Sequence, residues 1–201
     1  MVSGVTFHRR EPIRISAEGL LHPQEHLSAT ADHVPFLSSR MLQLRIATIA
    51  HHLAKDYRGK EFQLLVVLKG GKPFGDALAK ELRKDGAQFS VHAVQLSSYQ
   101  DRKSTGAVTL HGAMPKLANQ PVLIVEDIID TGLSLKFLID LLHQKGLQEI
   151  GVCALFRKQL KNQQILPVQY LGFDIPDVFV VGFGMDCDEQ YRELEYVAKM
   201  R

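Results

Sequence analysis

The sequence predicts an α/β fold, a mostly parallel twisted sheet flanked by helices. Apolar runs rich in Val, Leu and Ile, such as 62–68 and 121–125, have the continuous hydrophobicity of strands that are buried on both faces. Between these runs, apolar residues recur at helical spacing. Because strands alternate with helices of about a dozen residues, parallel pairing with helices on both faces is favoured.

The first elements follow from local pattern. Residues 1–36 hold Pro12, Pro23 and Pro35 without a sustained period, which predicts an irregular peripheral segment. A helix is predicted over 38–55, where Ser38 or Ser39 can cap the N-terminus.

A strand–turn–helix unit is predicted next. The apolar run 62–68 is the strand, 69–73 the turn, and 74–86 a helix that ends near Gly86. The polar, glycine-containing segment 97–106 is predicted to be a surface loop between strands.

The remaining elements complete the alternation. A helix over 133–146 also ends in a glycine, and 187–194 is predicted to form a terminal turn of helix. The other strands are expected at 88–96, 121–127, 149–156, 168–175 and 178–184.

Composition excludes several functional classes. With 201 residues the chain can form one sizeable core, and a formal charge of +2 lacks the cationic excess typical of duplex nucleic-acid binding. No apolar run approaches the roughly 20 residues needed to span a bilayer, and the N-terminus lacks a secretory pattern. We therefore expect a cytoplasmic protein with reduced Cys153 and Cys187, and no zinc site among its histidines.

Three acids stand where the strand 121–127 meets the next helix: Glu126, Asp127 and Asp130. Ligands of parallel sheets collect at this edge, and the following segment 130–134, DTGLS, offers hydroxyls and backbone N–H groups suited to a phosphate. A sugar phosphate with Mg²⁺ would reconcile the acids with the anion, because ribose hydroxyls and the cation can both engage carboxylates. The alternative is that Asp127 and Asp130 only cap the following helix.

The stretch VLIVEDIIDTG, 122–132, resembles the phosphoribosyl-diphosphate (PRPP) binding motif of type I phosphoribosyltransferases. The segments 66–74, 97–106, 175–186 and 188–194 resemble further segments of the hypoxanthine-guanine (6-oxopurine) branch, in the same order. The resemblance runs from about Ser38 to Leu194. It implies a type I phosphoribosyltransferase fold, a single domain over 1–201 whose core spans about 38–160 and whose small hood comes from about 1–37 and 161–201.

The activity implied by this resemblance is Mg²⁺-dependent purine salvage. The 5-phosphoribosyl group of PRPP would pass to N9 of hypoxanthine or guanine, giving IMP or GMP and pyrophosphate. The implied partners are small-molecule substrates, without nucleic acid or membrane, and the implied assembly is a homodimer or homotetramer. Two alternatives stay open: a xanthine-preferring enzyme, and a non-catalytic regulator of the same fold that senses PRPP or nucleotides.

The resemblance also implies roles for individual residues, with Asp130 as the catalytic acid/base group near purine N7. PRPP phosphate and ribose would be bound by Glu126, Asp127, Asp130, Thr131, Gly132, Leu133 and Ser134. Pyrophosphate would be bound by Lys69, Gly70 and Arg192, with a cis peptide between Leu68 and Lys69. Mg²⁺ would be held by Glu126, Asp127 and Asp186.

The implied purine pocket consists of Ile128, Lys158, Phe179, Val180 and Asp186, and the implied lid carries Ser98 and Tyr99. Lys158 has three donors and no acceptor, so it can satisfy a 6-oxo group but opposes the amino group of adenine. Without the resemblance, Phe179 would be interpreted as a core aromatic and Arg192 as a solvated helix charge.

Overall fold

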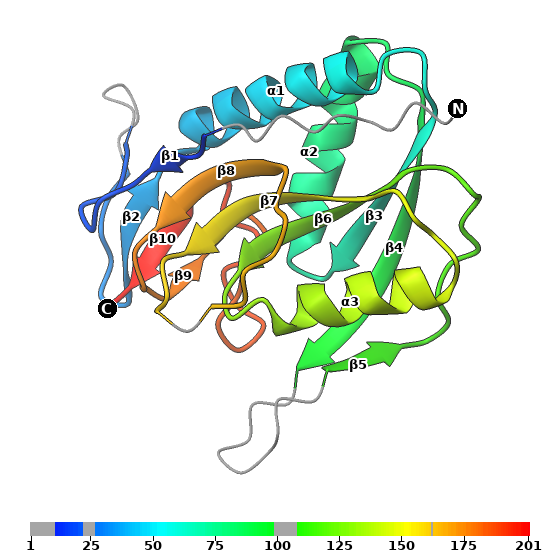
Figure 1. Ribbon diagram of the computed structural model, residues 1–201. Helices are drawn as coiled ribbons and strands as arrows, with labels where there is room; N and C mark the ends of the chain where they lie inside the picture. The colour runs from blue at the N-terminus through cyan, green and yellow to red at the C-terminus, as the bar shows by residue number, and fades with distance from the viewer. Residues whose placement is uncertain (1–10, 22–26, 99–107, 162) are drawn as a thin grey trace.

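A seven-stranded sheet forms the centre of the computed structural model, which describes residues 11–21, 27–98, 108–161 and 163–201 (Figure 1). Its order is β1-β8-β7-β6-β3-β4-β5, and every neighbouring pair except β4–β5 is parallel. The strands are β1 (Ile13–Arg14), β3 (Phe62–Leu68), β4 (Phe89–Ser98), β5 (Val108–His111), β6 (Val122–Ile129), β7 (Ile150–Lys158) and β8 (Tyr170–Ile175). The predicted α/β class with a mostly parallel sheet is confirmed.

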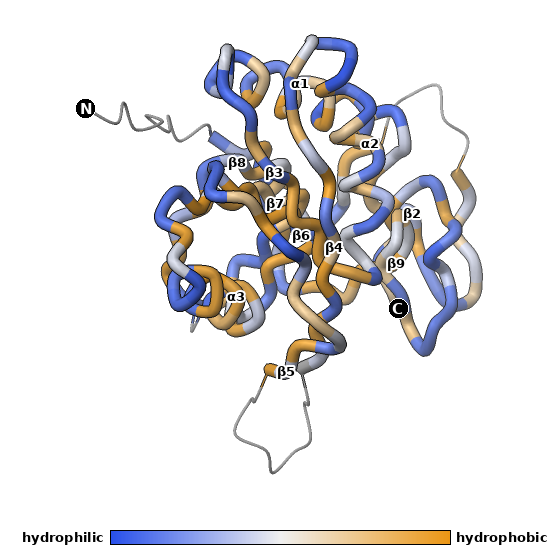
Figure 2. Tube along the Cα trace, turned by 90° about the vertical axis from the view of Figure 1, so that its right-hand side faces the viewer, coloured by the Kyte–Doolittle hydropathy of each residue, from blue (hydrophilic) through white to orange (hydrophobic). Residues whose placement is uncertain are grey.

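Helices cover both faces of this sheet. α1 (Ser39–Asp56) and α2 (Gly71–Lys84) lie on one face, and α3 (Leu133–Gln144) lies on the other (Figure 1). Successive residues of β3 alternate between the two cores: Leu64 packs on the α1–α2 side and Leu65 on the α3 side. The central strands therefore form a hydrophobic band between helices that have polar outer faces (Figure 2).

A second, three-stranded sheet joins segments from the two ends of the chain. β2 (His33–Leu37) pairs antiparallel with β10 (Val197–Met200), which also pairs with β9 (Val180–Val181). The prediction that 1–36 is irregular was wrong for β1 and β2, and β10 was not predicted. The strands β2 and β10 pair although they lie far apart in the sequence, with His33 opposite Met200. Local sequence patterns do not reveal such a pairing.

Several predicted boundaries shift. The Ser38 side chain caps α1 by accepting a hydrogen bond from the Met41 N–H, as predicted. The segment 69–73 is only partly a turn, since α2 already begins at Gly71; Pro73 is tolerated because first-turn N–H groups have no intrahelical acceptor. The strand β6 continues to Ile129, two residues beyond the predicted end at Asp127, so Glu126 and Asp127 lie inside the strand rather than at its last two positions.

The C-terminal prediction was wrong. Residues 187–194 form no helix, because Asp188, Glu189 and Tyr191 have φ of 50°, 62° and 72°, in the left-handed region that a right-handed helix cannot use. The strand predicted over 178–184 is only β9, followed by a turn in which Phe183 has φ of 49°. No helix among the described residues combines the length and apolarity needed to cross a membrane.

Candidate active site

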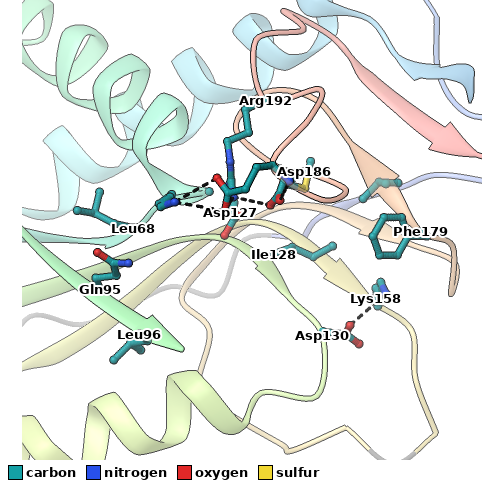
Figure 3. A pocket seen from close by; sticks show the side chains of 15 residues that line it. Leu68, Gln95, Leu96, Asp127, Ile128, Asp130, Lys158, Phe179, Asp186 and Arg192 are labelled. Carbon is teal, nitrogen blue, oxygen red and sulfur yellow. Dashed lines mark hydrogen bonds and ion pairs between the residues drawn. The ribbon is translucent and has the colours of Figure 1, made fainter. Parts of the chain in front are cut away.

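A cavity of about 510 Å³ opens at the carboxyl ends of β3, β6 and β7, where ligands of parallel sheets collect. Its volume is within the range of small-molecule sites. The loop after β3, the end of β6 and the segment around β9 supply most of its lining. Figure 3 shows Lys158, Asp130 and Phe179 at one end, with Arg192, Asp186 and Asp127 grouped apart from them.

The first end combines an ammonium, a carboxylate and an exposed aromatic ring. Lys158 is the last residue of β7, and its Nζ donates a hydrogen bond of 3.1 Å to Asp130 Oδ2, just beyond the end of β6 (Figure 3). Asp177 Oδ1 lies 3.8 Å from the same ammonium. The Phe179 side chain is 54% exposed although large and apolar, and Ile128 lines the same cavity. A flat polar ring could be stacked and hydrogen-bonded here.

The second end is built on the loop between β3 and α2. A cis peptide joins Leu68 to Lys69, as the resemblance predicted. A Cβ added to Gly70 would overlap the Asp127 carboxylate, and one added to Gly184 would overlap the Gly70 carbonyl. Glycine at these positions lets the Gly70 backbone approach the Asp127 side chain, and lets the Gly184 backbone approach the Gly70 carbonyl.

Two cations meet carboxylates at this end. Lys69 Nζ lies 3.1 Å from Glu189 Oε2, and Arg192 Nη2 lies 2.7 Å from Asp186 Oδ1 and 3.3 Å from Glu189 Oε1. Arg192 also donates to the Gly184 carbonyl at 2.8 Å. The hydrogen bond from Lys69, followed by that from Arg192, lowers the pKa of Glu189. Lys69 and Arg192 can bind an anionic group at this end of the cavity if the Asp186 and Glu189 carboxylates move away from them.

Glu126 and Asp127 are adjacent half-buried residues of β6, and Asp127 lies at the second end of the cavity (Figure 3). Burial first, and then the neighbouring Asp127 charge, raises the pKa of Glu126 well above its usual range. Burial also raises the pKa of Asp127, against the lowering effect of its hydrogen bonds and of Arg192. The buried Glu126 Oε2 has no hydrogen-bond partner in the described part of the chain. Two neighbouring buried carboxyl groups of this kind are stabilised by a bound proton, by a hydroxyl donor or by a cation.

The loop after β6 leads into the N-terminus of α3. Gly132 has φ of 85° and directly precedes the helix, while Thr131 Oγ1 accepts a bond of 3.4 Å from the Leu133 N–H. From the chain after β7, Gln163 donates to the Ile129 and Asp130 carbonyls, and the Gln164 N–H donates to the Thr131 carbonyl at 2.9 Å. These bonds hold the loop so that first-turn N–H groups of α3 can face an anion.

Most predicted site residues come together. The cavity is lined by Lys69, Gly70, Asp127, Ile128, Asp130, Lys158, Phe179, Val180, Asp186 and Arg192. Glu126 and the segment 131–134 do not line it but adjoin residues that do. Ser98 ends β4, and Tyr99 lies outside the described residues.

Sequence reasoning missed several neighbours of the site. Gln95 and Leu96 reach the cavity because β4 lies next to β3, and Glu189 reaches it through the irregular turn. The acidic character of 186–189 was visible in the sequence, but a helical interpretation would have directed these side chains elsewhere.

No preformed metal cage is present in the described part of the chain, where no three His, Cys, Asp or Glu side chains gather closely enough to hold an ion. The trio Glu126, Asp127 and Asp186 therefore does not form such a cage. Mg²⁺ does not require one, since it is commonly held by one or two carboxylates together with substrate phosphates.

Comparison with known proteins first shows the class of protein to which this chain belongs. Residues 37–189 match the family model described as phosphoribosyl transferase domain. The chain is 31% identical over 167 residues to a hypoxanthine-guanine phosphoribosyltransferase of Dictyostelium discoideum, covering 82% of this chain and 93% of the relative. It is 36% identical over 172 residues to the enzyme of that name from Mycobacterium tuberculosis (strain ATCC 25618 / H37Rv), covering 82% and 84%.

Solved structures agree. A hypoxanthine phosphoribosyltransferase of Staphylococcus aureus has a TM-score of 0.77 at 31% identity, covering 84% of this chain and 91% of that one. A hypoxanthine-guanine phosphoribosyltransferase of Bacillus anthracis has a TM-score of 0.75 at 30% identity, covering 84% and 96%. The chain belongs to the phosphoribosyltransferase family, in its hypoxanthine-guanine branch.

Proposed function

We propose that the protein transfers the 5-phosphoribosyl group of PRPP to N9 of hypoxanthine or guanine, giving IMP or GMP and pyrophosphate in purine salvage. The observation that carries this proposal is the Lys158–Asp130 pair beside the exposed Phe179, at the opposite end of one cavity from Lys69 and Arg192. A base and an anionic leaving group can occupy these two ends, with the ribose between them.

At the base end, the Lys158 ammonium donates to the 6-oxo group, and Phe179 and Ile128 pack against the purine. Val180 meets the edge of the base through its backbone, and Asp186, which lines the same cavity beside Arg192, is proposed to contact the base from that side. Asp130 holds or takes the proton at N7 while N9 bonds to the ribose carbon. A positioned carboxylate in this role typically contributes about 10²- to 10⁴-fold to rate, so positioning and electrostatics supply the remainder.

At the anion end, Lys69, Gly70 and Arg192 bind the pyrophosphate group. The 5′-phosphate is held by backbone N–H groups and hydroxyls of Thr131, Gly132, Leu133 and Ser134, at the N-terminus of α3. Glu126 and Asp127 accept hydrogen bonds from the ribose hydroxyls. The raised pKa of Glu126 supports this role, because the pair gains most from a neighbour that donates or carries positive charge.

Mg²⁺ fits this donor set. Glu126 Oε2 is buried without a hydrogen-bond partner among the described residues, and Asp127 lines the cavity near Asp186 (Figure 3). Glu126, Asp127 and Asp186 are the residues that would share it with substrate oxygens. When bound, Mg²⁺ neutralises charge on the departing pyrophosphate.

The architecture around the site suggests one domain over 1–201. Its hood, assigned to about 1–37 and 161–201, contains the antiparallel sheet β2–β10–β9, and β9 follows Phe179 directly. The strands β1 and β8 from these same ranges belong to the main sheet, so hood and core, about 38–160, share elements. The segment with Ser98 and Tyr99 is proposed as a lid that excludes water during transfer. A cytoplasmic homodimer or homotetramer is proposed.

The test is to incubate the protein with PRPP and Mg²⁺ and each of hypoxanthine, guanine, xanthine and adenine in turn, with detection of the monophosphate. IMP or GMP is expected, with little conversion of adenine. Preferential conversion of xanthine would identify the xanthine-preferring alternative. Absence of product with every base would refute the transferase and favour a PRPP-sensing regulator.

A further inference from the structure

Glu189 occupies an unusual position at the anion end of the cavity. Its carboxylate oxygens lie 3.1 and 3.2 Å from Lys69 Nζ, and one of them lies 3.3 Å from Arg192 Nη2. Lys69 comes from the loop after β3 and Arg192 from the turn after β9, so a single carboxylate joins the two cationic segments. These are the two side-chain cations that the proposed function assigns to pyrophosphate.

The backbone directs this side chain into the cavity. Glu189 has φ of 62°, and its N–H donates a hydrogen bond of 2.9 Å to Asp186 Oδ2. Its neighbour Asp188 has φ of 50°. Non-glycine residues seldom adopt this region unless their surroundings hold them there, so a specific turn geometry presents Glu189 to Lys69.

The contact is also easily broken. The side chains of Lys69 and Glu189 are 55% and 66% exposed, and ion pairs between exposed side chains are weak. The Glu189 carboxylate contacts both cations directly, and an exposed Glu is ionised at neutral pH, so it competes with another anion for the same donors. An incoming pyrophosphate group needs the same N–H donors and would displace the side chain into solvent.

We propose that Glu189 is an internal competitor for the pyrophosphate site: its carboxylate neutralises Lys69 and Arg192 while the site lacks an anion, and returns to them as pyrophosphate leaves. This inference rests on the proposed function. Glu189 is thus an affinity-setting residue that weakens binding of PRPP and of pyrophosphate without touching the base. Its effect is electrostatic and decreases as salt screens the exposed pair.

The test compares Glu189→Gln, which keeps the side-chain shape and removes the charge, with the wild-type protein. Calorimetric titration with pyrophosphate and Mg²⁺ should give a Kd about 1.5- to 5-fold lower for Glu189→Gln, the range for loss of one exposed ionic competitor. The difference should shrink at high salt. In turnover assays the KM for PRPP should fall while the KM for the base is unchanged, a split that general loosening of the turn would not produce.

The matched control is Glu193→Gln, which removes the same charge from an exposed position of the same segment. Its pyrophosphate affinity should change less than that of Glu189→Gln. Glu189→Asp keeps the charge on a shorter side chain; it should tighten binding by a smaller factor, and it serves as the test variant if Glu189→Gln does not fold.

Equal pyrophosphate affinity in wild type and Glu189→Gln, equal tightening by Glu193→Gln, or no binding to wild type would overturn the inference. The titration contains no base, so it judges Glu189 separately from the proposed reaction. If no base yields a monophosphate, the proposed function fails, and the titration still decides the role of Glu189.

Discussion

Replacing Asp130 by Asn tests the proposed chemistry at a single atom. The change preserves the shape of the side chain but removes its capacity to take the N7 proton. From the usual contribution of a positioned carboxylate, kcat should fall about 10²- to 10⁴-fold, equivalent to roughly 3 to 5 kcal/mol of barrier. Affinity for IMP or GMP should change much less.

The structure limits other causes of such a loss. The Asn side-chain carbonyl can still accept the hydrogen bond that Lys158 Nζ makes at 3.1 Å. Asp130 is 46% exposed, so loss of its ionic contact, discounted for solvent screening, should cost stability no more than about 1 kcal/mol. Thermal unfolding of Asp130→Asn should therefore remain close to that of the wild type.

The matched control is Asp177→Asn, which removes the same charge near the same ammonium, at 3.8 Å and with a side chain 68% exposed. Its kcat should stay within about tenfold of wild type, since the proposed chemistry does not involve it. Steady-state turnover with PRPP and hypoxanthine, together with nucleotide titration, gives both readouts. If Asp130→Asn turns over at the wild-type rate, or if both variants lose equally, Asp130 is not the acid/base group.

Three further predictions concern the site and the core. Because the pKa of Glu126 is raised in the folded state, folding favours the protonated carboxyl. The stability that this group contributes is therefore fully present below its unfolded pKa, near pH 4, and is lost as the pH rises toward its folded pKa. Glu126→Gln should therefore resist urea better than wild type at about pH 8, with the gap closing near pH 4; a constant gap would contradict the shift. Gly70→Ala should lower kcat/KM for PRPP about 10²-fold, because the new Cβ overlaps the Asp127 carboxylate and displaces the loop; unaltered kinetics would show that the loop adapts. Leu42→Ala, at a fully buried position of α1, should cost about 2 to 5 kcal/mol in urea unfolding, whereas Leu44→Ala on the same helix, 55% exposed, should cost about 0.5 kcal/mol; equal costs would refute the packing argument.

The central elements were predictable because their cause is local. The run FQLLVVL is buried almost throughout, and β3 occupies Phe62–Leu68, the range that its hydrophobicity predicts. The spacing of apolar residues in α1 and the capping side chain of Ser38 likewise lie within one segment. In these elements, propensity, pattern and tertiary burial favour the same structure.

Elements that depend on distant partners were not predictable. β5 exists through antiparallel pairing with β4, and β2 through pairing with β10. The residues of 187–194 have ordinary helix propensity, but hydrogen bonds from the Phe183 and Gly184 N–H groups to the Leu194 and Arg192 carbonyls hold an irregular turn instead.

The site shows the same division. The resemblance pointed to the acids, Lys158 and Arg192, because motifs can be matched in order along the chain without knowing where they lie in space. It did not reveal that Glu189 bridges Lys69 and Arg192, because that contact depends on left-handed backbone angles set by the surrounding turn.

The segment from Phe179 to Arg192 reaches both ends of the cavity, with its aromatic ring at one end and its guanidinium at the other (Figure 3). Backbone bonds tie it internally, including that from the Gly184 N–H to the Arg192 carbonyl at 3.0 Å. If a ligand at one end reorients this segment, it changes the free energy of binding at the opposite end. In that case thermodynamic reciprocity requires the occupants of the two ends to alter each other's affinity by one common factor.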